Sequence, residues 1–213
     1  MNESYRNEKL TYTDDGRLLD SNGHSVMMEW EDELMKIGAE TICRNGGDVL
    51  NVGFGMGIID TYIEEHRPRT HWIIEGHPDV QRKIIEDGWL KKPHVKVIFK
   101  PWQEVIYHLP KFDGIYFDTW AEDQMKFDSN IVNMLKPDGV YSFFNNPRGD
   151  EYGIHVAMDS FKILNNFCSI STHPMDIPHI DDIQTQRTDG DYYWHPNNKV
   201  YWNPICTLRQ EYK

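Results

Sequence analysis

Three glycines in one short stretch have the spacing of a loop that binds a ligand through its backbone. The stretch VLNVGFGMGIIDTYIEE, residues 49–65, places Gly53, Gly55 and Gly57 between an apolar run and a helix-like segment. Without side chains, such a loop lets a ligand approach the main-chain amides. The spacing lacks the Lys-Ser/Thr of a phosphate-binding P-loop, and Ile58 stands where a dinucleotide fingerprint has its third glycine. The same glycines would also suit tight packing of a strand against a helix.

Acidic side chains follow two of the expected strands. Glu75 ends HWIIEG, 22 residues after Gly53, where a carboxylate can accept hydrogen bonds from both hydroxyls of a ribose. The glycine loop and this acid suit either NAD or S-adenosylmethionine (SAM). Asp118 ends FDGIYFDT, which in a parallel sheet places it over the same pocket. A NAD-dependent oxidoreductase would also need an acid/base pair such as Tyr-x-x-x-Lys, and the sequence has none in a suitable place.

Segments after the third and fifth expected strands favour SAM. PWQEV puts Trp102 and Gln103 where an adenine ring would lie, and an aromatic face and an amide are suitable partners for a purine. LKPDGVYSFF is similar to the helix end, turn and fifth strand of class I methyltransferases. Asn145 and Asn146 follow that strand and are candidates for binding polar groups of a substrate or for forming a turn. NNP does not predict an adenine-methylating site, because that signature follows the fourth strand.

Alternating strands and helices must position these residues. The expected strands are DVLNVGF, HWIIEG, HVKVIFK, FDGIYFD and GVYSFFN, and the expected helices cover residues 57–66, 78–88, 102–109, 124–135 and 152–166. Short apolar strands alternating with helices of about ten residues predict a mostly parallel sheet covered on both faces, the α/β class. Residues 168–208 predict an antiparallel C-terminal hairpin. Its aromatic residues Tyr192, Tyr193, Trp194, Tyr201 and Trp202 would either wall a substrate pocket or form the core of the hairpin.

The first 25 residues differ from the rest of the chain. They are polar, with turn signals at DDGR and SNGH. They predict an N-terminal arm, residues 1–25, before a single domain over residues 26–213. From Val26 onward apolar residues recur at helical spacing, which predicts a helix up to about Arg44.

Composition narrows the classes of function and ligand. The 213 residues carry 22 Lys and Arg against 34 Asp and Glu, a net charge of −12 that argues against nucleic acid. No apolar run reaches the roughly 18 residues that cross a bilayer, and the start has no signal-peptide pattern, so we expect no membrane association and a cytoplasmic location. Cys43, Cys168 and Cys206 are too far apart for a zinc site or a disulfide framework, and we expect no metal.

From about Lys9 to Asn145 the sequence resembles the guanidino-group methyltransferases, namely guanidinoacetate methyltransferase and, more closely, the fungal δ-N (type IV) protein arginine methyltransferases. The matching stretches are KLTYTDDGRL, VMMEWEDELM, VLNVGFGMGIIDTYI, EGHPDV, DGW, FDGIYFDT and LKPDGVYSFFN. The resemblance implies a Rossmann-like, SAM-dependent class I fold and methylation of a guanidino nitrogen. One departure is Gln103, where guanidinoacetate methyltransferase has an acid. Another is NNPRGDEYG, which matches neither relative.

The resemblance also assigns roles to individual residues. It implies that the arm folds over the cofactor as a lid. The residues it places around the cofactor are Tyr12, Met27, Met35, Gly53, Phe54, Gly55, Gly57, Glu75, Trp102, Gln103 and Asp118. It places Glu31 and Asp118 at the guanidino group, where Asn145 and Asn146 are further candidates.

Two carboxylates are what the expected reaction needs. A guanidinium group has a pKa of about 13, so its neutral form costs about 8 kcal/mol at pH 7. Carboxylates grip the planar cation by bidentate hydrogen bonds and stabilise positive charge as it develops. Glu31 and Asp118 are therefore the expected catalytic pair. The sequence leaves open whether the substrate is arginine in a protein, free arginine or guanidinoacetate, and a non-catalytic SAM-binding protein remains an alternative.

Overall fold

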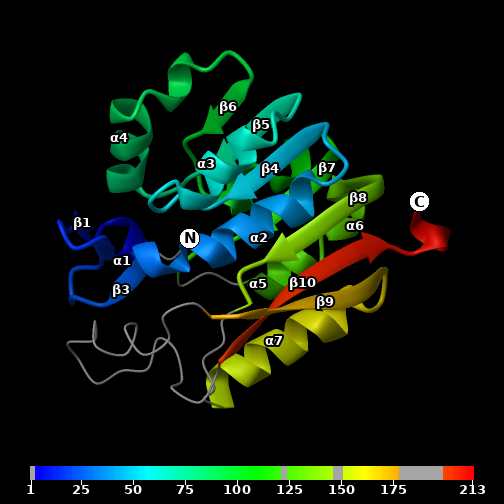
Figure 1. Cartoon of the computed structure of the whole chain (residues 1–213). Coiled ribbons are helices and arrows are strands. Elements are labelled where there is room, and N and C mark those ends of the chain that lie inside the picture. The colour runs from blue at the N-terminus through cyan, green and yellow to red at the C-terminus, as the bar shows by residue number, and fades with distance from the viewer. Residues whose placement is uncertain (1–2, 121–123, 146–150, 178–198) are drawn as a thin grey trace.

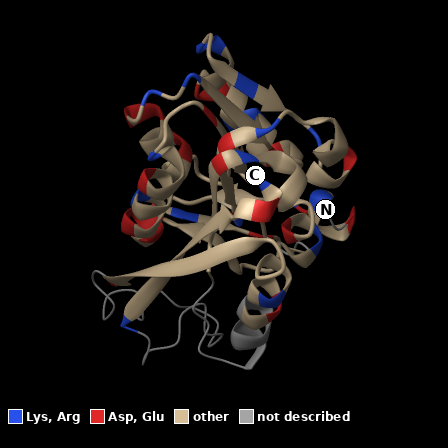
Figure 2. Ribbon diagram, turned by 90° about the vertical axis from the view of Figure 1, so that its right-hand side faces the viewer, with Lys and Arg blue, Asp and Glu red and all other residues tan. Residues whose placement is uncertain are grey.

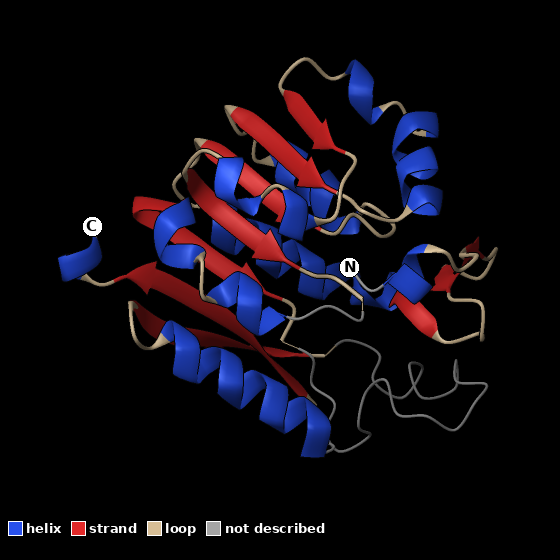
Figure 3. Cartoon of the chain, turned by 180° about the vertical axis from the view of Figure 1, so that it is seen from behind, coloured by secondary structure: helices blue, strands red, loops and turns tan. Residues whose placement is uncertain are grey.

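A computed structural model describes residues 3–120, 124–145, 151–177 and 199–213, and over residues 151–157 only the course of the backbone. A twisted sheet forms the centre, and helices cover both of its faces (Figure 1, Figure 3). Within these residues the sheet has seven strands in the order β6-β5-β4-β7-β8-β10-β9. The strands are β4 (Asp48–Val52), β5 (Thr70–Ile74), β6 (Val95–Ile98), β7 (Phe112–Phe117), β8 (Leu135–Phe143), β9 (Cys168–Asp176) and β10 (Val200–Leu208).

The directions of the strands confirm the predicted fold class. Strands β4 to β8 pair in parallel. Strand β10 runs antiparallel to β8, and β9 runs antiparallel to β10, which forms the C-terminal hairpin. Few charged residues lie on this hairpin, and β10 has no Lys, Arg, Asp or Glu (Figure 2).

Successive residues of each central strand enter two different hydrophobic cores. Val49, Ile73 and Tyr116 pack on one side of the sheet, and Leu50 and Phe117 pack on the other. Parallel strands that are covered on both faces need this continuous apolar character. The helices of the first side are α2 (Asp32–Cys43), α3 (Ile58–Glu65) and α4 (Pro78–Glu86), and those of the second are α5 (Gln124–Asp128), α6 (Ile131–Met134) and α7 (Glu151–Leu164).

The predicted helix from Val26 to about Arg44 is wrong over its first turns. Residues Ser25–Met28 form strand β3, Glu29–Glu31 form the 3₁₀ turn η1, and helix α2 begins only at Asp32. The cause is a tertiary contact, because β3 pairs with strand β2 (Arg17–Leu19). The spacing of apolar residues reports burial, and a short buried strand can imitate one turn of a helix.

The N-terminal segment is folded rather than extended. Its elements are α1 (Glu3–Arg6), β1 (Thr11–Tyr12) and β2, and the order β1-β2-β3 forms a small antiparallel sheet that crosses residue 25. Tyr5, Leu10 and Leu18 are buried at 7%, 2% and 0% exposure and join the core beneath α2 and α3. A few well-spaced apolar residues are therefore enough to dock this polar segment.

The expected helix over residues 124–135 is divided in two. Helix α5 ends at Asp128 and α6 begins at Ile131. The Ser129 hydroxyl and the Asn130 amide donate to the backbone carbonyls four residues earlier. Such side chains compete with the helix for backbone groups.

In the described ranges, no helix is long and apolar enough to cross a membrane.

Candidate active site

The glycine loop follows β4 and faces the carboxyl end of β7. At Gly53, where φ is +95°, an added Cβ would lie 1.8 Å from the Asp118 carbonyl oxygen. At Gly55 it would lie 2.7 Å from Met27 Sδ. Gly53 therefore needs glycine for its close approach to the Asp118 backbone, and both positions favour glycine because φ is positive, +95° at Gly53 and +54° at Gly55. The loop thus brings β4, β7 and β3 together at one point.

Glu75 holds the loop from the neighbouring strand. Its Oε2 accepts the Phe54 N–H at 3.0 Å, and its Oε1 accepts the His77 N–H at 2.6 Å. The side chain is buried, and burial raises the pKa of this carboxyl. A carboxylate has about four lone-pair sites, so one that receives these amides can still accept hydroxyl groups on its open side.

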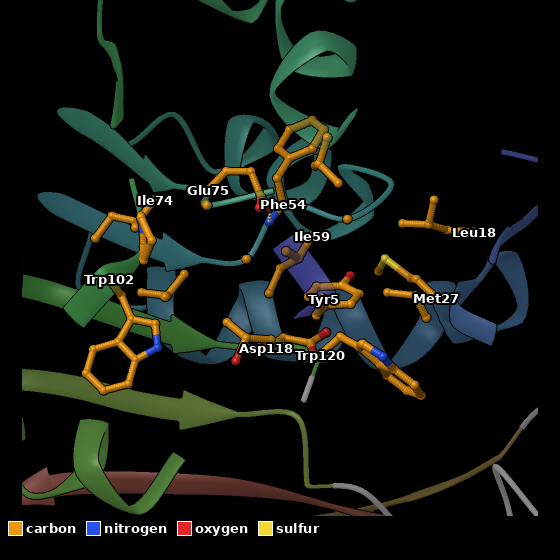
Figure 4. A pocket seen from close by; sticks show the side chains of 18 residues that line it. Tyr5, Leu18, Met27, Phe54, Ile59, Ile74, Glu75, Trp102, Asp118 and Trp120 are labelled. Carbon is orange, nitrogen blue, oxygen red and sulfur yellow. Dashed lines mark hydrogen bonds between the residues drawn. The ribbon is translucent and has the colours of Figure 1, made fainter. Parts of the chain in front are cut away.

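A pocket opens between the loop and the N-terminal segment, with about 680 Å³ of open space including its mouth (Figure 4). Its lining consists of Tyr5, Leu18, Val26, Met27, Val52, Gly53, Phe54, Gly55, Ile59, Ile74, Glu75, Gly76, Val80, Pro101, Trp102, Asp118, Thr119 and Trp120. This lining is mostly apolar, with carboxylates from Glu75 and Asp118. Most binding sites for small molecules and cofactors have this character.

The N-terminal segment is tied to the glycine loop by two direct contacts. The Tyr12 hydroxyl donates to the Gly55 carbonyl at 2.9 Å. Met27 Sδ accepts the Met56 N–H at 3.3 Å. Met27 lines the pocket, whereas Tyr12 lies beside it. The segment therefore forms a wall of the pocket.

Helix α4 provides a second attachment for the same segment. The Leu10 N–H donates to Asp79 Oδ2 at 2.8 Å. His77 Nδ1 accepts the Asp79 N–H at 3.1 Å, and Nε2 lies 3.1 Å from the Tyr5 carbonyl, so the imidazole is neutral with its proton on Nε2. Burial lowers the pKa of His77 and stabilises this neutral form.

The other residues predicted around the cofactor divide into two groups. Trp102 lines the pocket and packs edge-on against Phe117 and Phe127. Gln103 is half-buried beside it, on the 3₁₀ turn Trp102–Glu104. Met35 is fully buried in the core under α2 and does not line the pocket. Its helical position, one turn after Glu31, accounts for that burial.

The two carboxylates of the expected guanidino site have different surroundings. Asp118 lines the pocket, and within the described part of the chain its carboxylate has no hydrogen bond or ion pair. Burial raises its pKa to about 7. Glu31 is 1% exposed at the end of η1, and its Oε1 accepts the Met28 N–H at 2.9 Å. Met27, one residue before Met28, contacts the glycine loop at Met56, and Gly53 of that loop lies against the Asp118 backbone, so both carboxylates belong to segments that meet at this end of the sheet.

Asn145 lies at the same end but makes structural contacts. Its backbone N–H donates to the Tyr201 hydroxyl at 3.2 Å, and its Nδ2 donates to the Trp202 carbonyl at 3.0 Å. The amide thus fastens the end of β8 to β10. Asn146 and residues 192–194 lie outside the described residues. Tyr201 is fully buried, whereas Trp202 is half exposed.

A buried polar network supports the glycine loop from below. Asn51 Nδ2 donates to the Gly53 carbonyl and to Asp60 Oδ2, both at 2.9 Å. His71 Nε2 lies 2.9 Å from Asp60 Oδ1, and its Nδ1 lies 2.9 Å from Glu64 Oε1. An imidazole between two carboxylates must carry both protons. Burial alone would lower the pKa of His71, but the hydrogen bonds to Asp60 and Glu64 outweigh this effect, so the pKa of His71 is raised.

The sequence did not identify several residues of this site. Tyr5 and Leu18 line the pocket from elements that have no recognisable motif. Trp120 follows Asp118 by two residues, and this position just after a strand could have indicated that Trp120 lines the pocket. Within the described part of the chain, no group of three or more His, Cys, Asp or Glu residues is arranged to hold a metal ion.

The sequence model of one family, described as guanidinoacetate N-methyltransferase, matches residues 1–152. The chain belongs to this family. It is also 36% identical to protein arginine N-methyltransferase 2 of Candida glabrata, a match covering 91% of this chain and 52% of the relative. The corresponding protein of Yarrowia lipolytica is 38% identical over 96% of this chain and 47% of its own length. The chain thus spans about half the length of these curated relatives. The predicted resemblance is confirmed.

Solved structures agree on the fold of this guanidinoacetate N-methyltransferase family member. Spermidine synthase from Thermotoga maritima superposes with a TM-score of 0.66 at 16% identity, over 94% of this chain and 69% of that one. Precorrin-6y C5,15-methyltransferase from Geobacter metallireducens superposes with a TM-score of 0.59 at 13% identity, and the match covers 82% of this chain and 86% of that one. Likeness at such low identity shows the class I methyltransferase fold and nothing about substrates.

Proposed function

We propose that this chain is a SAM-dependent N-methyltransferase that acts on the guanidino group of arginine. The observation that carries the proposal is the Asp118 carboxylate in the pocket, which has no partner among the described residues, with the buried Glu31 carboxylate at the same end of the sheet. A buried acid without a partner is costly, and a cationic ligand relieves that cost. Membership of a family described by guanidinoacetate methylation supports the same chemistry.

The pocket fits SAM by its shape and its donor set. Gly53 and Gly55 keep side chains out of the loop that a ligand must approach. Glu75 offers carboxylate lone pairs for the ribose hydroxyls, and Trp102 offers an apolar wall for the adenine. Bound there, SAM supplies an electrophilic methyl group. NAD, the alternative from the sequence, has no further support in the described residues.

The chain's own contribution is to grip, orient and deprotonate. Glu31 and Asp118 accept hydrogen bonds from the guanidinium and hold one nitrogen toward the cofactor site. That nitrogen loses a proton when it gains a methyl group. Asp118, whose pKa lies at about 7, is the carboxylate suited to take it up near neutral pH.

The curated relatives favour arginine over guanidinoacetate as the substrate, because they are named protein arginine N-methyltransferase 2. Guanidinoacetate remains the second candidate because the family carries its name.

The test is transfer of a labelled methyl group from SAM to a panel of acceptors: arginine peptides, free arginine, guanidinoacetate and lysine peptides. We expect transfer to arginine peptides and none to lysine. Glu31→Gln and Asp118→Asn should each lower turnover by at least about 100-fold, the value of a charged hydrogen bond in a dry site. The double variant should be far less than multiplicatively worse.

Calorimetry with SAM and with NAD supplies the control. SAM should bind in a 1:1 ratio to wild type and to Glu31→Gln, while NAD should show no saturable binding. Near-normal turnover in either single variant would disprove the carboxylate clamp. A non-guanidino acceptor that proves best would overturn the assigned reaction while leaving the fold and the cofactor intact.

A further inference from the structure

Two tyrosines lie beside the carboxylate pair. Tyr116 lies on β7, two residues before Asp118, which follows the end of that strand, and the Tyr116 ring packs on α2. Tyr201 comes from β10, and both tyrosines are 0% exposed. Burial raises the pKa of both phenols, and the negative charges of Asp118 and Glu31 raise it further. The two hydroxyls therefore stay protonated at every working pH.

The Tyr201 hydroxyl is already engaged by the protein. It accepts the Asn145 N–H at 3.2 Å and lies 3.4 Å from the Phe143 carbonyl. The Tyr201 ring also stacks on Phe144, with ring centroids 6.1 Å apart. This hydroxyl therefore fixes the end of β8 against β10.

The Tyr116 hydroxyl is placed differently. Its oxygen is buried and makes no hydrogen bond of good geometry with any described residue. The Tyr201 hydroxyl is its neighbour and, after burial, the first influence that raises the pKa of Tyr116. The Tyr116 ring lies directly on helix α2, because a Cβ added at Gly38 would stand 2.6 Å from Cε2 and 3.3 Å from the hydroxyl oxygen. The phenol is thus held rigidly against α2, the helix that follows Glu31, and lies two residues before Asp118.

A tyrosine at position 116 should make the folded protein less stable than a phenylalanine there would. A buried hydroxyl without a good partner loses its hydration and gains little in return. Its chemistry matches a need of the proposed substrate, since a guanidinium group has five N–H donors. A hydroxyl oxygen can accept one of these N–H groups alongside the two carboxylates, of which Glu31 already accepts the Met28 N–H.

We propose that the Tyr116 hydroxyl oxygen accepts an N–H of the substrate guanidinium, while its own proton points to the Tyr201 oxygen. Tyr116 is then a substrate-contacting residue, and Tyr201 positions it. This assignment rests on the proposed function. It adds a neutral, directional acceptor to a site that otherwise selects its ligand by charge.

The variants Tyr116→Phe and Tyr141→Phe test this assignment against a matched control. The Tyr141 hydroxyl donates to Asp128 at 2.6 Å and lies in the opposite core, away from the carboxylates. For Tyr116→Phe we expect the KM for an arginine peptide to rise at least about tenfold, with SAM affinity unchanged and a melting temperature equal to or above wild type. Tyr141→Phe should lower the melting temperature and leave the KM unchanged.

The outcomes separate the two proposals. An unchanged KM in Tyr116→Phe, with wild type active on arginine, overturns the Tyr116 assignment alone. A raised KM accompanied by a lowered melting temperature also overturns it, because that pair of effects signals a structural hydroxyl. If wild type neither methylates nor binds any guanidino compound, the proposed function fails and this assignment fails with it. Tyr201→Phe should reproduce the KM effect more weakly.

Discussion

Asp118 and Glu31 differ in what they contact, so we expect the two carboxylates to have different roles in the proposed reaction. Glu31 receives a backbone amide, whereas Asp118 has no hydrogen-bond partner for its carboxylate among the described residues, and burial raises its pKa to about 7. Asp118 is therefore protonated in acid and ionised in base within the physiological range. Only the ionised form attracts a guanidinium.

This titration gives a prediction at the residue scale. A raised folded-state pKa means that the uncharged form persists until the pH passes about 7. We expect kcat/KM for an arginine peptide to rise about tenfold per pH unit below that value and to level off above it. The measurement is a pH profile from 5.5 to 9. Asp118→Asn should keep a low, flat profile, and a wild-type profile flat across pH 7 would contradict the role of Asp118.

At the scale of elements, the glycine loop is supported by a buried network. Asn51 links the Gly53 carbonyl to Asp60, and Asp60 shares the His71 imidazolium with Glu64. Removing the cation would take the charged partner from the buried Asp60 carboxylate, whereas Glu64 would keep its contacts with Lys92 and His94. The position of the loop therefore depends on a charge that does not touch the pocket.

His71→Gln should lower the free energy of unfolding by about 3 kcal/mol and weaken SAM binding. The pKa of His71 is raised by its hydrogen bonds to Asp60 and Glu64, so its stabilising effect is complete below about pH 6.5 and is lost as the pH rises through the folded-state value. Urea unfolding of both proteins at several pH values should show the difference shrinking in base. The more exposed His94→Gln should cost less than about 1 kcal/mol. Equal costs for the two variants would argue against the network.

The central strands were predictable from the sequence, and two other elements were not. Apolar runs such as DVLNV end at glycine or at an acid, so their type and order could be recognised locally. Strand β3 was mistaken for helix because its pairing with β2 is a contact between separate segments, invisible to periodicity. The break between α5 and α6 comes from side chains that bond back to the helix, which spacing alone does not reveal.

At the scale of the whole molecule, the N-terminal segment and the α/β domain form one packed unit. Leu10 and Leu18 are buried in the core, Tyr5 lines the pocket, and Tyr12 bonds to the loop. The resemblance implied a lid over the cofactor, which stays a prediction, and in the structure the segment is docked against the pocket. The individual contacts join segments that are far apart in the sequence, with separations from 29 to 72 residues, so only Tyr12 and Met27 were named from the sequence. Tyr116 was missed because a tyrosine inside a strand is usually core.

Removal of residues 1–22 should therefore affect binding more than folding. The truncated protein loses the pocket walls Tyr5 and Leu18, so we expect SAM affinity to fall by more than about 100-fold. The remaining sheet should still melt cooperatively, at a lower temperature, as circular dichroism would show. Tyr12→Phe, which loses one hydrogen bond, should cost about tenfold or less. Wild-type affinity in the truncated protein would show that the segment is dispensable.

The direct run of β3 into η1 sets a limit on chain length. Met27 is fixed by the Met56 amide at one end of this run, and Glu31 is fixed by the Met28 amide at the other. Only three residues separate Met27 from Glu31. An insertion or deletion between them would therefore move one of these two side chains, because no flexible loop lies between them to absorb the change. The turn at Gly23 has more room, because a Cβ added there would meet no atom within 4 Å. The number of residues between Met27 and Glu31 therefore determines how far the Glu31 carboxylate lies from the pocket wall at Met27.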